Sequence, residues 1–207
     1  MKKIVLVIFL LAGSMAVGRA QESRQDVSLS GIGLIEPFIA SSTDVQVHSN
    51  YALGALLSYR FMLTPSSALE ANYGVTYQNT MRYVVGNTNN YKILTRTQEI
   101  SAAYVRSFTY RKFNPFVEAG PAALIFLPIR NSGTTTLDAK QQTAIAGMYG
   151  AGVAYEISPS FDIRAEYRGL VTKVPNFGLG SSTSTENLTT NKWYNIYVPT
   201  VGVAYHF

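Results

Sequence analysis

The 207-residue sequence contains no cysteine. This absence excludes disulfides, thiolate chemistry, cysteine-rich zinc sites and a lipid-modified cysteine anchor. Histidine is almost as scarce, because His48 and His206 are the only imidazoles that the chain offers for acid–base catalysis or metal binding. No stretch provides the ~20 apolar residues that a transmembrane helix needs. We therefore expect no metal site, no cofactor and no helical membrane span.

The N-terminus has the three parts of a secretory signal peptide. Lys2 and Lys3 form a basic start, residues 4–12 are apolar, and Gly18-Arg19-Ala20 is a small-x-small cleavage site. The sequence predicts a cleaved signal peptide over residues 1–20 and one mature domain over residues 21–207. An exported chain of this kind either stays soluble or enters a membrane as a β-barrel.

The net charge of +5 is not a property of the mature domain. Without Lys2, Lys3 and Arg19, the 17 basic residues fall to 14 against 12 acidic ones, a net charge of +2. This small excess gives no electrostatic basis for binding nucleic acid.

The stretch from Trp193 to Phe207 has two different faces if it is an extended strand. Its odd positions are bulky and apolar, with aromatics at both ends, and its even positions become small or polar. A strand between lipid and a filled barrel interior has this layout. The final Val203, Tyr205 and Phe207 resemble the C-terminal signal that the assembly machinery of Gram-negative outer-membrane barrels reads.

Eight alternating segments are predicted along the mature chain. They cover residues 27–39, 51–61, 68–78, 92–108, 115–127, 142–157, 161–171 and 193–207. The connections between them are short and long in turn, the long ones being 40–50, 79–91, 128–141 and 172–192. Outer-membrane barrels alternate in this way, with short periplasmic turns and long extracellular loops. Pro37, Pro121 and Pro199 fall inside segments, where we expect bulges or local breaks.

The two faces of these segments predict a polar lumen and an aromatic girdle at each rim. The charged side chains assigned to the lumen are Glu36, Arg60, Glu70, Glu99, Glu118, Glu156, Asp162, Arg164, Glu166 and Arg168. The girdle aromatics are Tyr51, Tyr59, Phe61, Tyr77, Phe108, Tyr155, Phe161, Trp193 and Tyr197. Eight strands leave just enough room for side chains to fill the lumen. The charges then form either a plug of ion pairs, which we favour, or an ion path with a gate.

The chain resembles the small eight-stranded barrels of the OmpA/OmpX type. The resemblance rests on the signal peptide, the eight alternating segments, the alternation of short and long connections, the charged lumen and the terminal Phe207. The resemblance implies an all-β fold, an antiparallel up-and-down transmembrane barrel that is integral to a bacterial outer membrane. Its implied partners are outer-membrane lipid, lipopolysaccharide, the barrel assembly machinery and an extracellular ligand of the loops. We expect a monomer. No peptidoglycan-binding domain follows Phe207, so the anchoring role of larger members is not implied.

The function expected first is a structural or adhesion-like surface role without enzymatic activity. A narrow channel is the main alternative. Another is a lipid A-modifying barrel enzyme, for which His48 and Ser49 with Asp44 in the first long loop are the candidates. A soluble periplasmic barrel for lipids is the last alternative, but it would need large apolar side chains inside.

Overall fold

The computed structural model describes residues 24–40, 45–85, 89–133, 137–179 and 187–207. The predicted signal peptide lies outside these residues. Eleven strands form one antiparallel sheet within the described ranges. They are β1 (Gln25–Leu34), β2 (Ile39–Ala40), β3 (Val45–Ser49), β4 (Ala52–Thr64), β5 (Ser67–Tyr77), β6 (Asn79–Val85), β7 (Asn89–Ser107), β8 (Phe113–Gly133), β9 (Gln142–Ser158), β10 (Phe161–Lys173) and β11 (Trp193–His206). No helix in the described ranges is long and apolar enough to cross a membrane.

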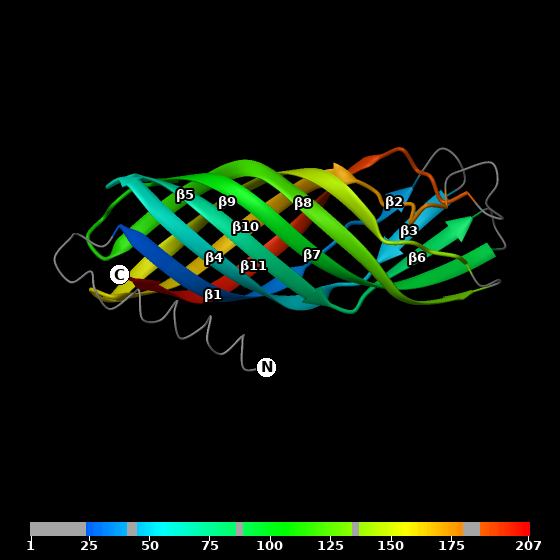
Figure 1. Ribbon diagram of the computed structural model, residues 1–207, viewed down its shortest axis with the longest axis horizontal. Helices are drawn as coiled ribbons and strands as arrows, with labels where there is room; N and C mark the ends of the chain where they lie inside the picture. The colour runs from blue at the N-terminus through cyan, green and yellow to red at the C-terminus, as the bar shows by residue number, and fades with distance from the viewer. Residues whose placement is uncertain (1–23, 41–44, 86–88, 134–136, 180–186) are drawn as a thin grey trace, which may run out of the picture.

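Eight of the strands close into a barrel with the order β1-β4-β5-β7-β8-β9-β10-β11 (Figure 1). Closure is completed by β1 against β11, where Val27 lies opposite Tyr205 and Ile32 opposite Thr200. Each predicted segment corresponds to one barrel strand. The predicted fold class, an eight-stranded antiparallel barrel, is therefore confirmed.

Strands β2, β3 and β6 lie beyond the barrel and continue it along its long axis (Figure 1). They pair in the order β2-β3-β6 onto the outer part of β7, which also pairs with the outer part of β8. We call these strands the extension. The sequence predicted long loops over residues 40–50 and 79–91, and this was wrong for most of those residues. Val45, Val47, Met81 and Tyr83 are all buried, so apolar alternation holds these residues in strands.

A β-bulge marks the junction between barrel and extension. Leu94 lies opposite Arg130 and Thr95 opposite Pro128, so Ile129 is the additional residue in β8. Pro128 sits beside the bulge, where the missing backbone N–H disturbs the ladder least.

The three prolines singled out by the sequence interrupt pairing without bulges. Pro37 lies in the irregular stretch between β1 and β2. Pro121 stands where the pairing of β7 with β8 is interrupted, between Ser101–Ala122 and Tyr104–Ala119. Pro199 stands where the pairing of β1 with β11 is interrupted, between Ile32–Thr200 and the Ile35–Tyr197 bridge. The register is the same on both sides of each gap, so the strands stay aligned while donors are missing.

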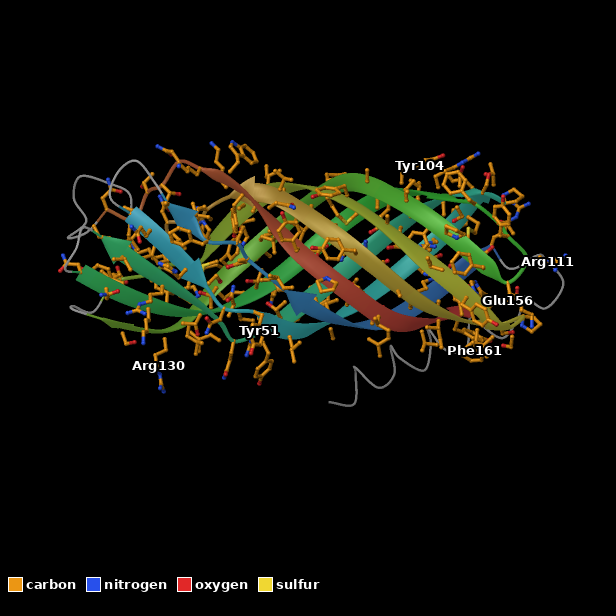
Figure 2. The ribbon with its side chains drawn as sticks, turned by 180° about the vertical axis from the view of Figure 1, so that it is seen from behind. Tyr51, Tyr104, Arg111, Arg130, Glu156 and Phe161 are labelled. Carbon is orange, nitrogen blue, oxygen red and sulfur yellow. The ribbon has the colours of Figure 1, made fainter. Side chains whose placement is uncertain are left out.

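Apolar side chains form a belt around the outside of the barrel, as Figure 2 shows for Tyr104 and Phe161. Leu29, Leu53, Leu57, Leu69, Ile100, Ile163 and Val201 are among its exposed members. Such an area of exposed apolar surface is typical of a protein that contacts lipid. The ends of β1 and β11 that carry the two chain termini lie together, and we call that end of the barrel the inner end and the opposite one the outer end.

Candidate functional site

The barrel interior near the inner end is held by an ion pair between β10 and β1, which are not neighbours in the chain, and by a histidine–carboxylate contact between the paired strands β11 and β10. Arg164 on β10 places Nη2 2.7 Å from Oδ2 of Asp26 on β1. His206 on β11 places Nε2 2.8 Å from Oδ2 of Asp162. Asp26 is fully buried, and an ionised side chain there needs such a partner because an isolated buried charge is very costly.

One layer further from the inner end, Arg60 on β4 pairs with Glu70 on β5. The guanidinium places Nη2 2.6 Å from Glu70 Oε2, and Nε donates to the same oxygen at 2.7 Å. The Arg60 guanidinium also lies 4.8 Å from the ring centroid of Phe116. Arg60 therefore makes an ion pair with Glu70 and a cation–π contact with Phe116 on β8.

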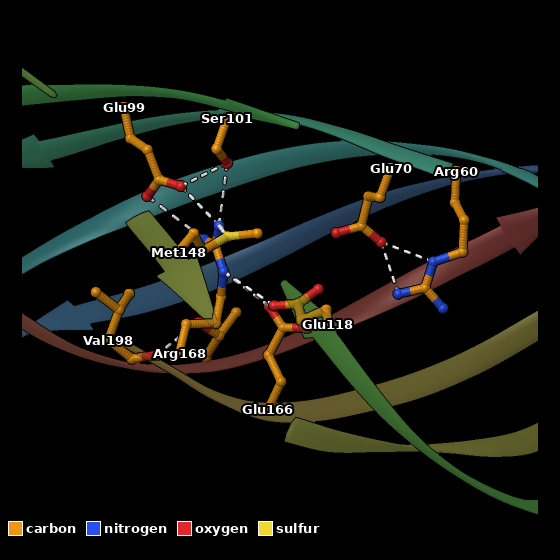
Figure 3. A network of polar contacts seen from close by, with 10 residues as sticks. Arg60, Glu70, Glu99, Ser101, Glu118, Met148, Glu166, Arg168 and Val198 are labelled. Atoms are coloured by element: carbon orange, nitrogen blue, oxygen red, sulfur yellow. Dashed lines mark hydrogen bonds and ion pairs between the residues drawn. The ribbon is translucent and has the colours of Figure 1, made fainter. Parts of the chain in front are cut away.

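Arg168 is the centre of the interior network (Figure 3). Its Nη2 lies 2.6 Å from Glu99 Oε1, and its Nε lies 3.3 Å from Glu118 Oε1 and 3.9 Å from Glu166 Oε1. The Arg168 side chain is fully buried, so one cation organises three carboxylates from strands β7, β8 and β10. Gly150 makes this possible, because a Cβ there would lie 2.6 Å from Glu118 Oε1.

A second hydrogen bond ties the Arg168 network to β7. Ser101 donates to Glu99 Oε1 at 2.8 Å and accepts from Arg168 Nη2 at 3.2 Å. Neither carboxylate oxygen of Glu118 accepts a hydrogen bond from the described residues. We call the nine side chains of these layers the charged half of the interior: Asp26, Arg60, Glu70, Glu99, Glu118, Asp162, Arg164, Glu166 and Arg168.

Towards the outer end the interior becomes apolar. The buried apolar side chains there, which we call the apolar half, are Ile32, Leu34, Leu56, Leu124, Phe126, Leu170, Ile196 and Val198. The buried Thr76 and Thr97 lie among them, and Thr76 Oγ1 donates to the Thr97 carbonyl at 3.2 Å. The apolar side chains join the buried core of the extension, in which the Phe177 ring packs edge-on against both Tyr83 and Phe126. Side chains thus fill the lumen at both levels, but with different chemistry.

Glu36 is the acid predicted for the lumen that lies apart from the others. It follows β1 just beyond the Ile35–Tyr197 bridge and is buried beside Ser49, Asn79 and Tyr194. Burial raises the pKa of Glu36 to about 7, although the three polar neighbours oppose the shift. The Glu36 carboxyl is therefore a buried titratable group at the junction between barrel and extension.

A polar hollow of about 390 Å³ opens at the inner end. Arg60, Arg164 and Phe116 line it, together with Glu156, Asp162 and His206. The residues of the Arg168 network do not line it. The hollow therefore stops below that network.

The structure can be compared with each residue that the sequence assigned to the lumen. Eight of the ten lie together in the charged half: Arg60, Glu70, Glu99, Glu118, Asp162, Arg164, Glu166 and Arg168. Glu156 lines the hollow at the inner end, and Glu36 lies at the junction between barrel and extension. The sequence missed Asp26, because the first segment was expected to begin at Val27. Extending the same alternation by one residue pair, from Ser28 to Asp26, would have found it.

The other assigned residues lie on the outside of the barrel. Tyr51, Tyr59, Phe61, Tyr77, Phe108, Tyr155, Phe161 and Trp193 are exposed, and Tyr197 is half-buried. Val203 and Tyr205 are also exposed, and the Tyr205 ring lies 5.1 Å from that of Phe161 and 6.1 Å from that of Phe207. Their roles in the girdles and in assembly remain predictions.

The residues considered for lipid A chemistry are not brought together. His48 and Ser49 are consecutive in β3, so their side chains point to opposite faces of the sheet. The Ser49 hydroxyl donates to Asn79 Oδ1 at 2.9 Å, and the His48 ring packs 4.5 Å from that of Phe38. Asp44 lies outside the described residues. Within the described ranges, no three His, Cys, Asp or Glu side chains gather as a metal site.

Comparison with known proteins agrees with this geometry. The family model described as "Outer membrane protein beta-barrel domain" matches residues 5–207. No curated protein sequence is significantly similar to this chain.

Solved structures show the same fold. The N-terminal β-barrel domain of Pseudomonas aeruginosa OprF is 16% identical, with a TM-score of 0.52 over 90% of this chain and 100% of that one. OprG from the same organism is 12% identical, with a TM-score of 0.54 over 90% and 97%. Neisserial surface protein A is 16% identical, with a TM-score of 0.52 over 89% and 98%. The chain therefore belongs to the outer-membrane protein β-barrel domain family, and it is a bacterial outer-membrane protein.

Proposed function

We propose that the protein is a closed barrel with a structural and surface-interaction role, carried by the extension outside the membrane. The observation that carries this proposal is the filled interior. Arg168 is fully buried among Glu99, Glu118 and Glu166, and the layers outward from it are packed with apolar side chains. An ion would have to displace the ion pairs and then cross an apolar layer, and both steps are costly.

The folded extension supports the surface role. Its apolar core includes Tyr83, Phe126, Phe177 and Leu188, and this core packs β3 and β6 firmly onto the end of the barrel. A rigid sheet presents side chains in fixed positions at low entropic cost on binding. With the chain termini on the periplasmic side, this sheet faces outward.

Conductance in a planar lipid bilayer tests the closed barrel directly. The mature chain, refolded and checked by its heat-dependent mobility on a gel, should give no discrete current steps at neutral pH. Steady steps that disappear when the protein is boiled before insertion would overturn the proposal.

A narrow channel is the second candidate, and one observation favours it. The hollow at the inner end is polar, and above it both oxygens of Glu118 lack hydrogen bonds from the described residues. Water at these positions would make the charged half a partial ion path. Channel activity of this origin should be cation-selective and should decrease in Glu118→Gln, whereas a closed barrel shows no current in either form.

We also propose that the protein is not an enzyme. The outward position of His48 and the opposite direction of Ser49 support this, as does the place of His206 at the inner end beside Asp162. Cells producing the His48→Ala variant should have the same lipid A mass profile as cells producing the wild type. A changed acyl pattern that depends on His48 would contradict the proposal.

A further inference from the structure

The outer face of the extension carries a cluster of basic side chains, the cations Arg82, Lys92 and Arg130 with the imidazole of His48, which the proposed function does not explain. His48 lies opposite Arg82, and Arg82 lies opposite Lys92, so these side chains form one row across β3, β6 and β7. Arg130 on β8 lies opposite Leu94, two residues from Lys92. Figure 2 shows the Arg130 side chain pointing away from the ribbon at this end of the molecule.

Acidic residues are absent from the outer parts of the strands that carry these basic side chains, beyond Glu99 on β7 and Glu118 on β8. The sequence has no Asp or Glu between residues 71 and 98 or between 119 and 137. Among the described residues beyond the barrel, the exposed carboxylate is that of Asp138, which lies 3.7 Å from Lys140 Nζ. The acids of the described chain lie mainly in the barrel interior, so the outer surface is far more basic than the small net charge suggests.

A hollow of about 480 Å³ lies within the row. It is lined by His48, Asn50, Thr80, Arg82, Val84, Asn90 and Lys92. Arg82 is already oriented there, because its Nε donates to Asn90 Oδ1 at 3.2 Å. Cations beside neutral amides and a hydroxyl suit a ligand with both phosphate and sugar hydroxyl groups.

The position of the cluster along the barrel axis, relative to the predicted outer aromatic girdle, indicates where that ligand is. Arg96 lies 5.5 Å from the ring centroid of Tyr77, one of the aromatics predicted for the outer girdle. Lys92 is four residues further along β7, which corresponds to roughly 10 Å along the barrel axis for a strand tilted by about 40°. The cations thus occupy the level just above the hydrocarbon, and they face sideways from the barrel axis, where neighbouring lipids stand.

We infer that this basic face, formed by His48, Arg82, Lys92 and Arg130, binds the phosphorylated saccharide headgroup of lipopolysaccharide in the surrounding outer leaflet. Charge complementarity and height together favour a membrane glycolipid over a soluble polyanion. Each Lys or Arg near an anionic lipid surface strengthens the attraction to it, and salt weakens that attraction. The inference rests on the proposed function for the outward placement of the extension.

The experiment compares binding of purified lipopolysaccharide to the full mature chain in a zwitterionic detergent, by surface plasmon resonance at about 50 mM salt. The test variant is Arg82→Glu/Lys92→Glu, with the milder Arg82→Gln/Lys92→Gln as a second pair. The matched control is Arg111→Glu/Lys112→Glu, which makes the same charge change on an exposed turn at the inner end. Heat-dependent gel mobility confirms that each variant is folded.

We expect the dissociation constant to rise at least tenfold in the test variant and less than twofold in the control. Dephosphorylated lipopolysaccharide should bind the wild type at least tenfold more weakly, and high salt should remove the difference between variants. Equal binding by test variant and wild type would overturn the inference, as would equal binding of the dephosphorylated form. Tighter binding of a soluble sulfated polysaccharide than of lipopolysaccharide, with the same loss in the test variant, would overturn the assignment to a membrane lipid.

Failure of this inference can be told apart from failure of the proposed function. Conductance reports on the interior, whereas lipopolysaccharide binding reports on the outer face of β3, β6 and β7. A conducting barrel that still loses lipopolysaccharide in the test variant would contradict only the closed barrel.

Discussion

The inner and outer halves of the barrel interior solve the problem of filling a small lumen in opposite ways. In the charged half, Arg60, Arg164 and Arg168 each lie 2.6–2.7 Å from a carboxylate on another strand. In the apolar half, side chains such as Ile196, Val198 and Leu124 fill the same cross-section by apolar packing. Buried ion pairs fix which strands meet and add little net stability, whereas apolar packing stabilises and excludes water. The charged half therefore fixes the register of the strands, and the apolar half keeps water out of the lumen.

The largest effect on this comparison should come from Arg168→Ala. It leaves Glu99, Glu118 and Glu166 without their shared cation, and breaking a buried ion pair from one side costs about 3–5 kcal/mol. The free energy of unfolding in urea, measured in lipid vesicles, should fall by that amount. Arg111→Ala on the exposed turn is the control and should change it by less than about 0.5 kcal/mol. Similar values for the two variants would mean that the charged half does not hold the barrel.

Arg164→Ala should cost about 3 kcal/mol, because Asp26 would lose its partner at 2.7 Å and keep the more distant His206 ring at 3.8 Å and the field of Arg60. A double-mutant cycle with Asp26→Asn sharpens the test. The double variant should be less destabilised than the sum of the two single variants, since the stranded charge is then gone. Additive losses would show that the pair is not coupled.

Glu36→Gln tests the outer boundary of the apolar half, at the junction between barrel and extension, through pH. In the unfolded chain the carboxyl loses its proton near its usual pKa of 4.5, whereas in the folded protein it keeps the proton up to about 7. The free energy of unfolding therefore decreases between pH 4.5 and 7, by up to about 3 kcal/mol, and is unchanged by this group outside that window. Glu36→Gln should remove that part of the pH dependence. Unfolding curves at pH 4, 6 and 8 with the same slope against pH in both proteins would contradict it.

Ile196→Val should have the smallest effect, about 1 kcal/mol, because it removes one buried methylene from the apolar half. The loss should be the same at pH 5 and pH 8 and at low and high salt, since no charge is involved. A loss that varies with salt would indicate that water and ions reach this layer.

Much of the fold follows from local alternation, which any single strand displays. The eight barrel strands and the inward direction of Arg60, Glu99 and Arg168 could be predicted, because a residue's face depends only on its position along its own strand. The ion-pair partners could not. Arg164 and Asp26 are 138 residues apart, and they meet only because the barrel closes.

The extension was missed for a different reason. Residues 45–49 and 79–85 alternate as clearly as some barrel strands, with Val47 and Tyr83 inward and His48 and Arg82 outward. The surrounding Ser, Thr and Asn favoured a loop, and strand pairing over so short a length depends on the apolar core beneath it. That core includes Phe177 and Leu188, which come from the predicted loop 172–192 and are distant in sequence.

The division of the interior can be tested most directly with a single introduced thiol, because the wild-type chain has no cysteine. Val198→Cys places the thiol in the apolar half, and Lys140→Cys places one on the exposed surface as a control. The folded protein is treated with a charged, water-soluble thiol reagent before and after boiling. A sealed apolar half predicts rapid labelling of Lys140→Cys in both states and labelling of Val198→Cys only after boiling. Equal labelling of both cysteines in the folded protein would show a water-filled lumen and contradict the closed barrel.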